Sequence, residues 1–203
     1  MDTALKATAL VCTLKPSPFD SSSDLIAAQV LDELGRHGVE GEAIRVVDHD
    51  IRPGVEADMG DGDQWPKIAE RIRNSDILVF ATPTWLGHMS SVAQRVLERL
   101  DAELSNTDDR GRPVMFGKIA VVAVVGNEDG AHKIIADSHQ ALNDIGFTIP
   151  AQGSTYWNSE AMNSQDFKDL EVTPTAVVTT TKTLAANAAH LGSLLAHQQY
   201  PAV

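Results

Sequence analysis

Features that would tie a chain to the cell exterior, a membrane or nucleic acid are scarce in this sequence. It has a single cysteine, Cys12, so no internal disulfide can form, and we expect a cytoplasmic location. No apolar run approaches the length of a membrane span, and the one near the N-terminus is too short for a signal peptide. Positive charge is scarce too. The 16 Lys and Arg against 28 Asp and Glu give a formal net charge of −12, which argues against nucleic-acid and membrane partners.

A metal site is not expected either. Seven histidines are present, but the helical pairs His132–His139 and His190–His197 are each seven residues apart. Seven residues span about 10 Å along a helix, too far for both side chains to bind one ion. Cys12 lies within an apolar run, where burial in a strand is a better interpretation than a reactive thiol.

What the sequence does contain is a strict alternation of strand-like and helix-like segments. Strand patterns cover Lys6–Thr13, Glu42–His49, Asp76–Pro83, Lys118–Gly126 and Phe147–Thr155, the last at an edge because of Pro150. Helical periods cover Ser22–His37, Trp65–Asn74, Ser90–Leu104, Ala131–Ile145 and Thr175–Ala196. This alternation predicts an α/β fold, a flavodoxin-like doubly wound five-stranded parallel sheet in the order 2-1-3-4-5 with helices on both faces. We expect residues 1–203 to form a single domain.

The fold predicts where a ligand would bind. In such a sheet, ligands bind at the carboxyl ends of the strands, beside the switch point between the first and third strands. The loops after the first, third and fourth strands read TLKPSPFDSSS, TPTWLGHMSS and GNEDGAH. We therefore expect these three loops to meet at one edge of the sheet and to build the functional site.

The first loop lacks the glycine-rich phosphate motifs GxGxxG and GxxxxGK[ST] and is rich in hydroxyl groups instead. Ser21, Ser22 and Ser23 lie where a helix begins, so their hydroxyls and the free backbone N–H groups of the first turn can bind one anion. Thr13, at the end of the strand, and Lys15 would complete a cup for a terminal monophosphate. The alternative is ordinary helix capping by serine in a surface loop.

The other two loops predict a platform for a planar ring. Trp85 and its apolar neighbours would pack against a flat ligand, and Gly87 would let the backbone approach it. Backbone N–H groups of the third loop could bond the polar edge of the ring. Alternatively, Trp85 only covers the end of the sheet, Asp129–Gly130 only forms a turn and Asn127 only caps a helix. The candidates are Pro83, Thr84, Trp85, Leu86, Gly87, His88 and Met89 in the second loop, and Asn127, Glu128, Asp129, Gly130 and Ala131 in the third.

Together the three motifs resemble the NAD(P)H-dependent FMN reductase and quinone reductase branch of the flavodoxin-like superfamily. The resemblance covers roughly Lys6 to Trp157 and is carried mainly by TPTWLGHMSS and GNEDGAH. It implies FMN as cofactor, with its phosphate on the hydroxyls of the first loop and its ring on the second and third loops. It also implies NAD(P)H as co-substrate, two-electron transfer to a quinone or similar small-molecule acceptor, and a homodimer or homotetramer.

The first loop departs from that family, because it lacks the short Ser-x-Arg form common in FMN reductases. It also lacks the T-x-T-G-x-T loop of electron-carrying flavodoxins, which argues against a one-electron carrier. A flavodoxin-type electron-transfer protein and a non-enzymatic flavin-binding module stay open as alternatives. The flavin would carry the chemistry, so no catalytic side chain is expected. Whether His88 or His132 contacts the flavin is left open.

Overall fold

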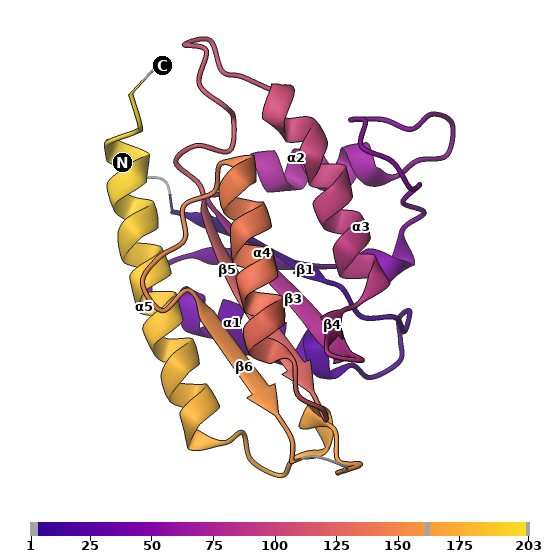
Figure 1. Ribbon diagram of the computed structural model, residues 1–203. Helices are drawn as coiled ribbons and strands as arrows, with labels where there is room; N and C mark the ends of the chain where they lie inside the picture. The colour runs from indigo at the N-terminus through magenta and orange to yellow at the C-terminus, as the bar shows by residue number, and fades with distance from the viewer. Residues whose placement is uncertain (1–3, 161–162, 202–203) are drawn as a thin grey trace.

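The computed structural model describes residues 4–160 and 163–201. Its five parallel strands follow the order β2-β1-β3-β5-β6, and a two-residue strand, β4, pairs antiparallel with the end of β3 (Figure 1). The strands are β1 (Lys6–Val11), β2 (Glu40–Arg45), β3 (Ile77–Trp85), β4 (His88–Met89), β5 (Ile119–Gly126) and β6 (Ser154–Asn158). The helices are α1 (Ser22–Gly35), α2 (Trp65–Arg73), α3 (Ser91–Leu100), α4 (Ala131–Ile145) and α5 (Thr175–His197). The predicted fold class and order are confirmed, with β5 and β6 as the fourth and fifth parallel strands.

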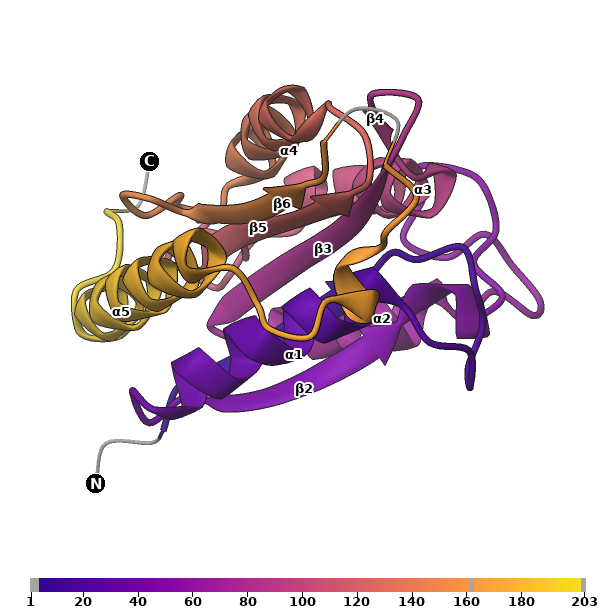
Figure 2. The ribbon, with the colours of Figure 1, turned by 90° about the horizontal axis from the view of Figure 1, so that it is seen from below.

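Two helical layers cover the sheet. α1 and α5 pack on one face, where Val30 and Leu184 belong to one buried apolar cluster. α2, α3 and α4 pack on the other face, where Ile68, Val96 and Ile134 belong to a second cluster. Figure 2 shows α4 on one side of the strands and α1 with α5 on the other. β5 supplies alternate side chains to both clusters, which explains why its sequence is apolar without interruption.

The second and fifth parallel strands are shifted from their predicted bounds. The second strand ends at Arg45, earlier than predicted, because Val46–Asp48 form a short 3-10 helix. The fifth parallel strand starts at Ser154, later than predicted. Pro150 has no N–H to offer the ladder, and Gln152 adopts a left-handed φ of 57° in the turn that follows. The predicted strand therefore breaks near its proline. Thr148 forms an isolated bridge with Ile119, and only Ser154 and Thr155 of the predicted range belong to β6, which continues to Asn158.

The third strand runs past its predicted end at Pro83 and becomes a hairpin. It continues to Trp85 and returns through Leu86 and Gly87, which have φ values of 51° and 73°. Two consecutive residues with positive φ are typical of the tight type I′ turn, whose twist matches that of the flanking strands. Trp85 pairs with His88 across this turn. The ring-facing loop expected from the sequence is thus a hydrogen-bonded hairpin.

A buried ion pair holds the long loop between β2 and α2. Arg99 of α3 lies 2.8 Å from the carboxylate of Asp63, and neither side chain is exposed. Arg99 also donates to the backbone carbonyls of Arg52 (2.9 Å) and Glu56 (2.8 Å). Its guanidinium carbon lies 5.7 Å from the centre of the Trp65 ring. This one arginine therefore ties the 50–63 loop to the helical layer beside the sheet.

Candidate functional site

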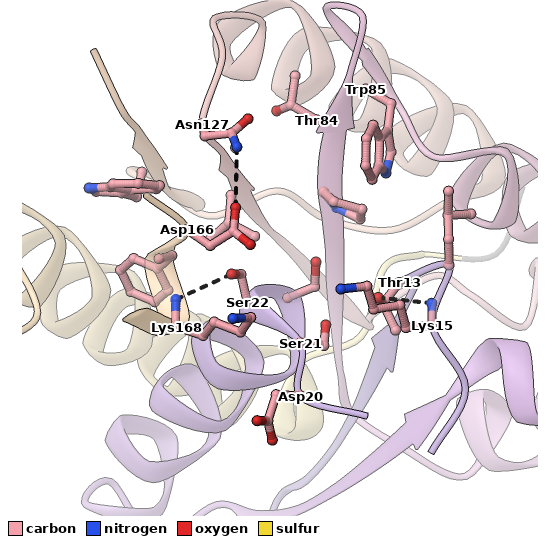
Figure 3. Close-up of a pocket in the computed structure, with 17 residues that line it drawn as sticks. Thr13, Lys15, Asp20, Ser21, Ser22, Thr84, Trp85, Asn127, Asp166 and Lys168 are labelled. Carbon is pink, nitrogen blue, oxygen red and sulfur yellow. Dashed lines mark hydrogen bonds between the residues drawn. The ribbon is translucent and has the colours of Figure 1, made fainter. Parts of the chain in front are cut away.

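A pocket opens at the carboxyl ends of β1, β3 and β5, where the three loops meet (Figure 3). The predicted residues that line it are Thr13, Lys15, Ser21, Ser22, Ser23, Pro83, Thr84, Trp85 and Asn127. The first loop wraps the start of α1, because Ser21 is the N-cap and Ser22 the first helical residue. Strands that run parallel end at the same edge of a sheet, so these residues meet although they are far apart in the chain.

Three hydroxyl oxygens of the pocket accept backbone N–H groups, which leaves their own protons available for donation to a ligand. Thr13 Oγ1 accepts a hydrogen bond from the backbone N–H two residues further along (3.4 Å). Ser21 Oγ accepts one from the N–H three residues further along (3.4 Å). Ser22 Oγ accepts one from the N–H of Lys168 (3.2 Å). Because each oxygen already accepts an N–H, its own proton is free to point into the pocket.

Ser23 adds a fourth hydroxyl. Its side-chain oxygen is buried and has no hydrogen-bond partner among the described residues, and the residue is 1% exposed. Buried polar atoms without a partner are rare, and one that lines a pocket points to a ligand. The first-turn N–H groups of α1 and the helix dipole also favour negative charge at this position. The four hydroxyls and the helix start form the hydroxyl cup, which suits an anion rich in acceptor oxygens.

Charged side chains of both signs surround the cup. Lys15 and Lys168 line the pocket, and so do Asp20 and Asp166. A hydrogen bond from Lys168 Nζ to Asp169 (2.7 Å), together with the charges of Asp169, Asp166 and Asp20, holds the pKa of Lys168 above its ordinary value. Lys168 is therefore a permanent cation beside the cup. The hydroxyl and N–H donors, rather than any net positive charge, give the pocket its preference for anions.

The hairpin forms the opposite wall. Trp85 is 53% exposed and lines the pocket, while Leu86 at the tip is 87% exposed. The N–H of Leu86 donates to Glu128 Oε1 (2.8 Å), which ties the hairpin to the loop between β5 and α4. Thr84 Oγ1, next in the wall, is buried without a hydrogen-bond partner in the described chain. An apolar, exposed aromatic beside an unsatisfied hydroxyl is typical of a ligand wall.

Glycines bring the second and third loops into contact. A Cβ on Gly130 would lie 2.8 Å from Gly87 Cα, and one on Gly126 would lie 2.7 Å from Thr84 Cβ. Only glycine permits these two approaches, one to the backbone of Gly87 and one to the side chain of Thr84. The hairpin and the β5–α4 loop are consequently one rigid wall.

The remaining predicted residues lie outside the pocket lining. Leu86 and Gly87 form the tip of the hairpin, and Glu128 binds Leu86. Asp129 Oδ1 accepts the N–H of Gly130 (2.7 Å), so it shapes the start of α4. His88 Nδ1 lies 3.3 Å from the amine of Lys133. Met89 is partly buried against the apolar cluster, and Ala131 is fully buried in it. His132 Nε2 lies 2.9 Å from the hydroxyl of Tyr156.

Sequence reasoning missed part of the pocket. Asp20 and the segment Asp166–Lys168 line it but were not among the candidate residues. The segment reaches the pocket from the connection between β6 and α5, where the sequence has neither a strand nor a helix period. No local signal marks it, because its position depends on contacts with residues far away in the chain.

The residues found fit no metal ion and do fit a phosphorylated planar ligand. Across residues 4–160 and 163–201, no group of three or more His, Cys, Asp or Glu side chains is arranged to hold a metal. No helix in the same part of the chain has the length and apolar character needed to cross a membrane. The unpartnered hydroxyls of Ser23 and Thr84 match, respectively, an anion in the cup and a polar group along the wall.

Comparison with known proteins supplies the family. The chain is 36% identical over 169 residues to a divalent metal cation transporter, MntH, of Mycobacterium bovis, covering 81% of this chain and 25% of that protein. It is 34% identical over 163 residues to the 8-demethyl-8-aminoriboflavin-5'-phosphate synthase of Streptomyces davaonensis, covering 76% of this chain and 63% of that protein. This chain thus spans about a quarter of the length of the transporter and less than two thirds of the length of the synthase.

A solved structure also resembles this chain over most of its length. The crystal structure of RosB with a bound 8-demethyl-8-formylriboflavin-5'-phosphate intermediate superposes with a TM-score of 0.88 at 30% identity, covering 97% of this chain and 82% of that one. Residues 5–162 match the family model of the NADPH-dependent FMN reductases. This chain therefore belongs to the NADPH-dependent FMN reductase family.

Proposed function

We propose that this protein binds FMN in the pocket and passes two electrons from NAD(P)H to a quinone or a similar small acceptor. The observation that carries the proposal is the hydroxyl cup at the start of α1, which offers donors without a glycine-rich diphosphate turn. Such a cup suits a terminal monophosphate. FMN ends in one, whereas the phosphates of FAD lie within the molecule.

Different residues of the chain would bind the phosphate and the ring of FMN. Thr13 and Ser21–Ser23 would hold the phosphate, with Lys15 at the rim. The ring would lie along Pro83, Thr84, Trp85 and Asn127, the residues of the second and third loops that line the pocket, in a wall held by glycine contacts. The exposed side chain of Trp85 would pack against a flat ligand while leaving one face of that ligand open. These residues bind and orient, and bound FMN would supply hydride acceptance and two-electron delivery.

A second candidate has specific support. Two of the comparisons name a riboflavin 5'-phosphate with a changed 8-position, one as the product of a synthase and one as a bound intermediate. On that candidate the flavin phosphate is a substrate of this protein and leaves in modified form. The hydroxyl cup would bind the flavin phosphate in both cases. The two candidates therefore differ in whether the flavin ring is chemically changed. The carrier and non-enzymatic alternatives differ in lacking NAD(P)H turnover.

We expect a simple spectroscopic result. Protein loaded with flavin under nitrogen should lose its yellow colour on addition of NADPH and regain it on addition of a benzoquinone. Heat should release FMN, identified by chromatography, with its ring unchanged. Recovery of FAD, or failure to take up any flavin, would contradict the proposal. A modified ring would favour the second candidate, and NAD(P)H that is not consumed in the presence of quinone would favour an electron carrier.

Removing the buried Ser23 hydroxyl should weaken FMN binding without harming the fold. Ser23→Ala should raise the Kd for FMN by about tenfold to a hundredfold, the usual worth of a hydrogen bond to a charged group. The melting temperature should not fall, because Ser23 Oγ has no partner to lose within the described chain. Ser138→Ala is a matched control, since Ser138 Oγ is also buried and unpartnered but lies on α4 away from the pocket. Equal FMN affinity in both variants would contradict the prediction.

Three broader features complete the proposal. We propose that residues 1–203 act as one FMN-binding domain, that the protein works in the cytoplasm, and that it forms a homodimer or homotetramer. One sheet with its two helical layers supports the single domain. The lone, buried Cys12, whose thiol has a pKa raised by burial, suits a reducing compartment. The exposed Trp85 and Leu86 beside the pocket are side chains that an assembly would cover.

A further inference from the structure

We propose that the segment Asp166–Lys168 makes this site selective for phosphorylated flavin, with Lys168 as the residue that decides between FMN and unphosphorylated riboflavin. The proposal rests on the proposed binding of FMN in the pocket. It concerns a part of the chain outside residues 5–162, the stretch that matches the family model. The family model by itself therefore assigns no role to this segment.

The segment is held firmly at the pocket. Phe167 is 2% exposed, and its ring centre lies 5.6 Å from that of Trp157 on β6. Asp166 Oδ1 accepts a hydrogen bond from the amide of Asn127 (3.2 Å), which anchors it to the β5–α4 loop. Figure 3 shows Asp166 and Lys168 approaching from the side of the pocket opposite Thr13. The segment thus closes the ring of residues around the cup.

One backbone contact orients the cup itself. The N–H of Lys168 donates to Ser22 Oγ (3.2 Å), as the dashed line in Figure 3 marks. That bond occupies an acceptor site of the hydroxyl and leaves its proton to donate to an anion. Ser22 therefore depends on a segment about 146 residues away in the chain for its donor role.

The side chain of Lys168 acts through charge. Two carboxylates, Asp20 and Asp166, line the pocket and would repel a phosphate dianion. The amine of Lys168 donates to Asp169 (2.7 Å), and the charges of Asp169, Asp166 and Asp20 all raise its pKa, so loss of this cation would leave three carboxylates near the cup without it. Riboflavin carries no phosphate and would not respond to this balance. Loss of the lysine charge should consequently affect one ligand and spare the other.

The test compares two probes, FMN and riboflavin, by the quenching of their fluorescence when they bind the intact chain of residues 1–203. Lys168→Met should raise the Kd for FMN by about tenfold or more and change the Kd for riboflavin by less than about twofold. Lys168→Arg should keep the wild-type ratio, because it keeps the charge. Lys182→Met, on the exposed face of α5, is the matched control for loss of a surface lysine. In the Lys168→Met background, Asp20→Asn should regain part of the lost FMN affinity.

The outcomes distinguish a wrong assignment of Lys168 from a wrong proposed function. An unchanged Kd for FMN in Lys168→Met, or an equal weakening of FMN and riboflavin, would overturn the assignment, while flavin binding by the wild type would leave the proposed function standing. A wild-type protein that binds neither probe would overturn the proposed function and the assignment with it. Failure of Asp20→Asn to restore affinity would overturn the charge-offset account.

Discussion

Ser22→Asp is expected to abolish retention of FMN by this protein. Ser22 lies at the first position of α1, and its hydroxyl proton is free to donate into the cup. An aspartate there would set a carboxylate against the phosphate. At about 4 Å and an effective dielectric constant of about 20, two like charges repel by about 4 kcal/mol. That energy corresponds to about a thousandfold increase in Kd. The fold should survive, because aspartate is favourable in the first turn of a helix.

The control for this substitution is a serine at the same position of another helix. Ser91 is the first residue of α3 and follows an N-cap serine, as Ser22 does in α1. Ser91→Asp should leave FMN affinity and the circular dichroism spectrum unchanged. Riboflavin binding should change little in either variant, since it has no phosphate. Wild-type FMN affinity in Ser22→Asp would show that the phosphate is bound elsewhere.

The largest effect on stability is expected from Arg99→Met. The substitution leaves the carboxylate of Asp63 buried without its cation, and breaking a buried ion pair in this way costs about 3–5 kcal/mol. Three carbonyls of the 50–63 loop also lose their donor. Urea denaturation should show the loss as a lower midpoint. Arg95→Met on the same helix removes an exposed side chain with one bond to a carbonyl and should cost about 1 kcal/mol or less.

The pH dependence provides a second measurement of the same pair. Burial alone would raise the pKa of Asp63, but backbone N–H bonds from Met59 and Trp65 and the bond from Arg99 outweigh it and hold the pKa below its ordinary value. A depressed pKa contributes stability that is complete above the unfolded value and is lost as the pH falls through the folded one. The wild type should therefore lose stability in strong acid, and its advantage over Arg99→Met should shrink there. A difference that stays constant down to strong acid would contradict this role for Asp63.

Much of the fold could be predicted from the sequence because the residues that determine each strand and helix are close together in the chain. The uninterrupted apolar run of β5 predicts a strand buried on both faces, and the periodic apolar residues of α1 and α4 predict helices between strands. The serines that start α1 identify the cup, since a helix start presents its N–H groups wherever it occurs. Parallel topology then places the loops after β1, β3 and β5 at one edge.

The tertiary structure decided what local patterns could not. Glu128 binds the N–H of Leu86 rather than a ligand, and Asp129 shapes the start of α4, because the hairpin and the β5–α4 loop pack together through Gly87 and Gly130. The segment Asp166–Lys168 reaches the cup through contacts with Trp157, Asn127 and Ser22, all distant in the chain. Propensity and periodicity report only on neighbours within a few residues. The sequence by itself therefore determined the sheet, its helices and the serine-rich start of α1, whereas the closing wall and the place of Lys168 beside the hydroxyl cup depended on long-range packing.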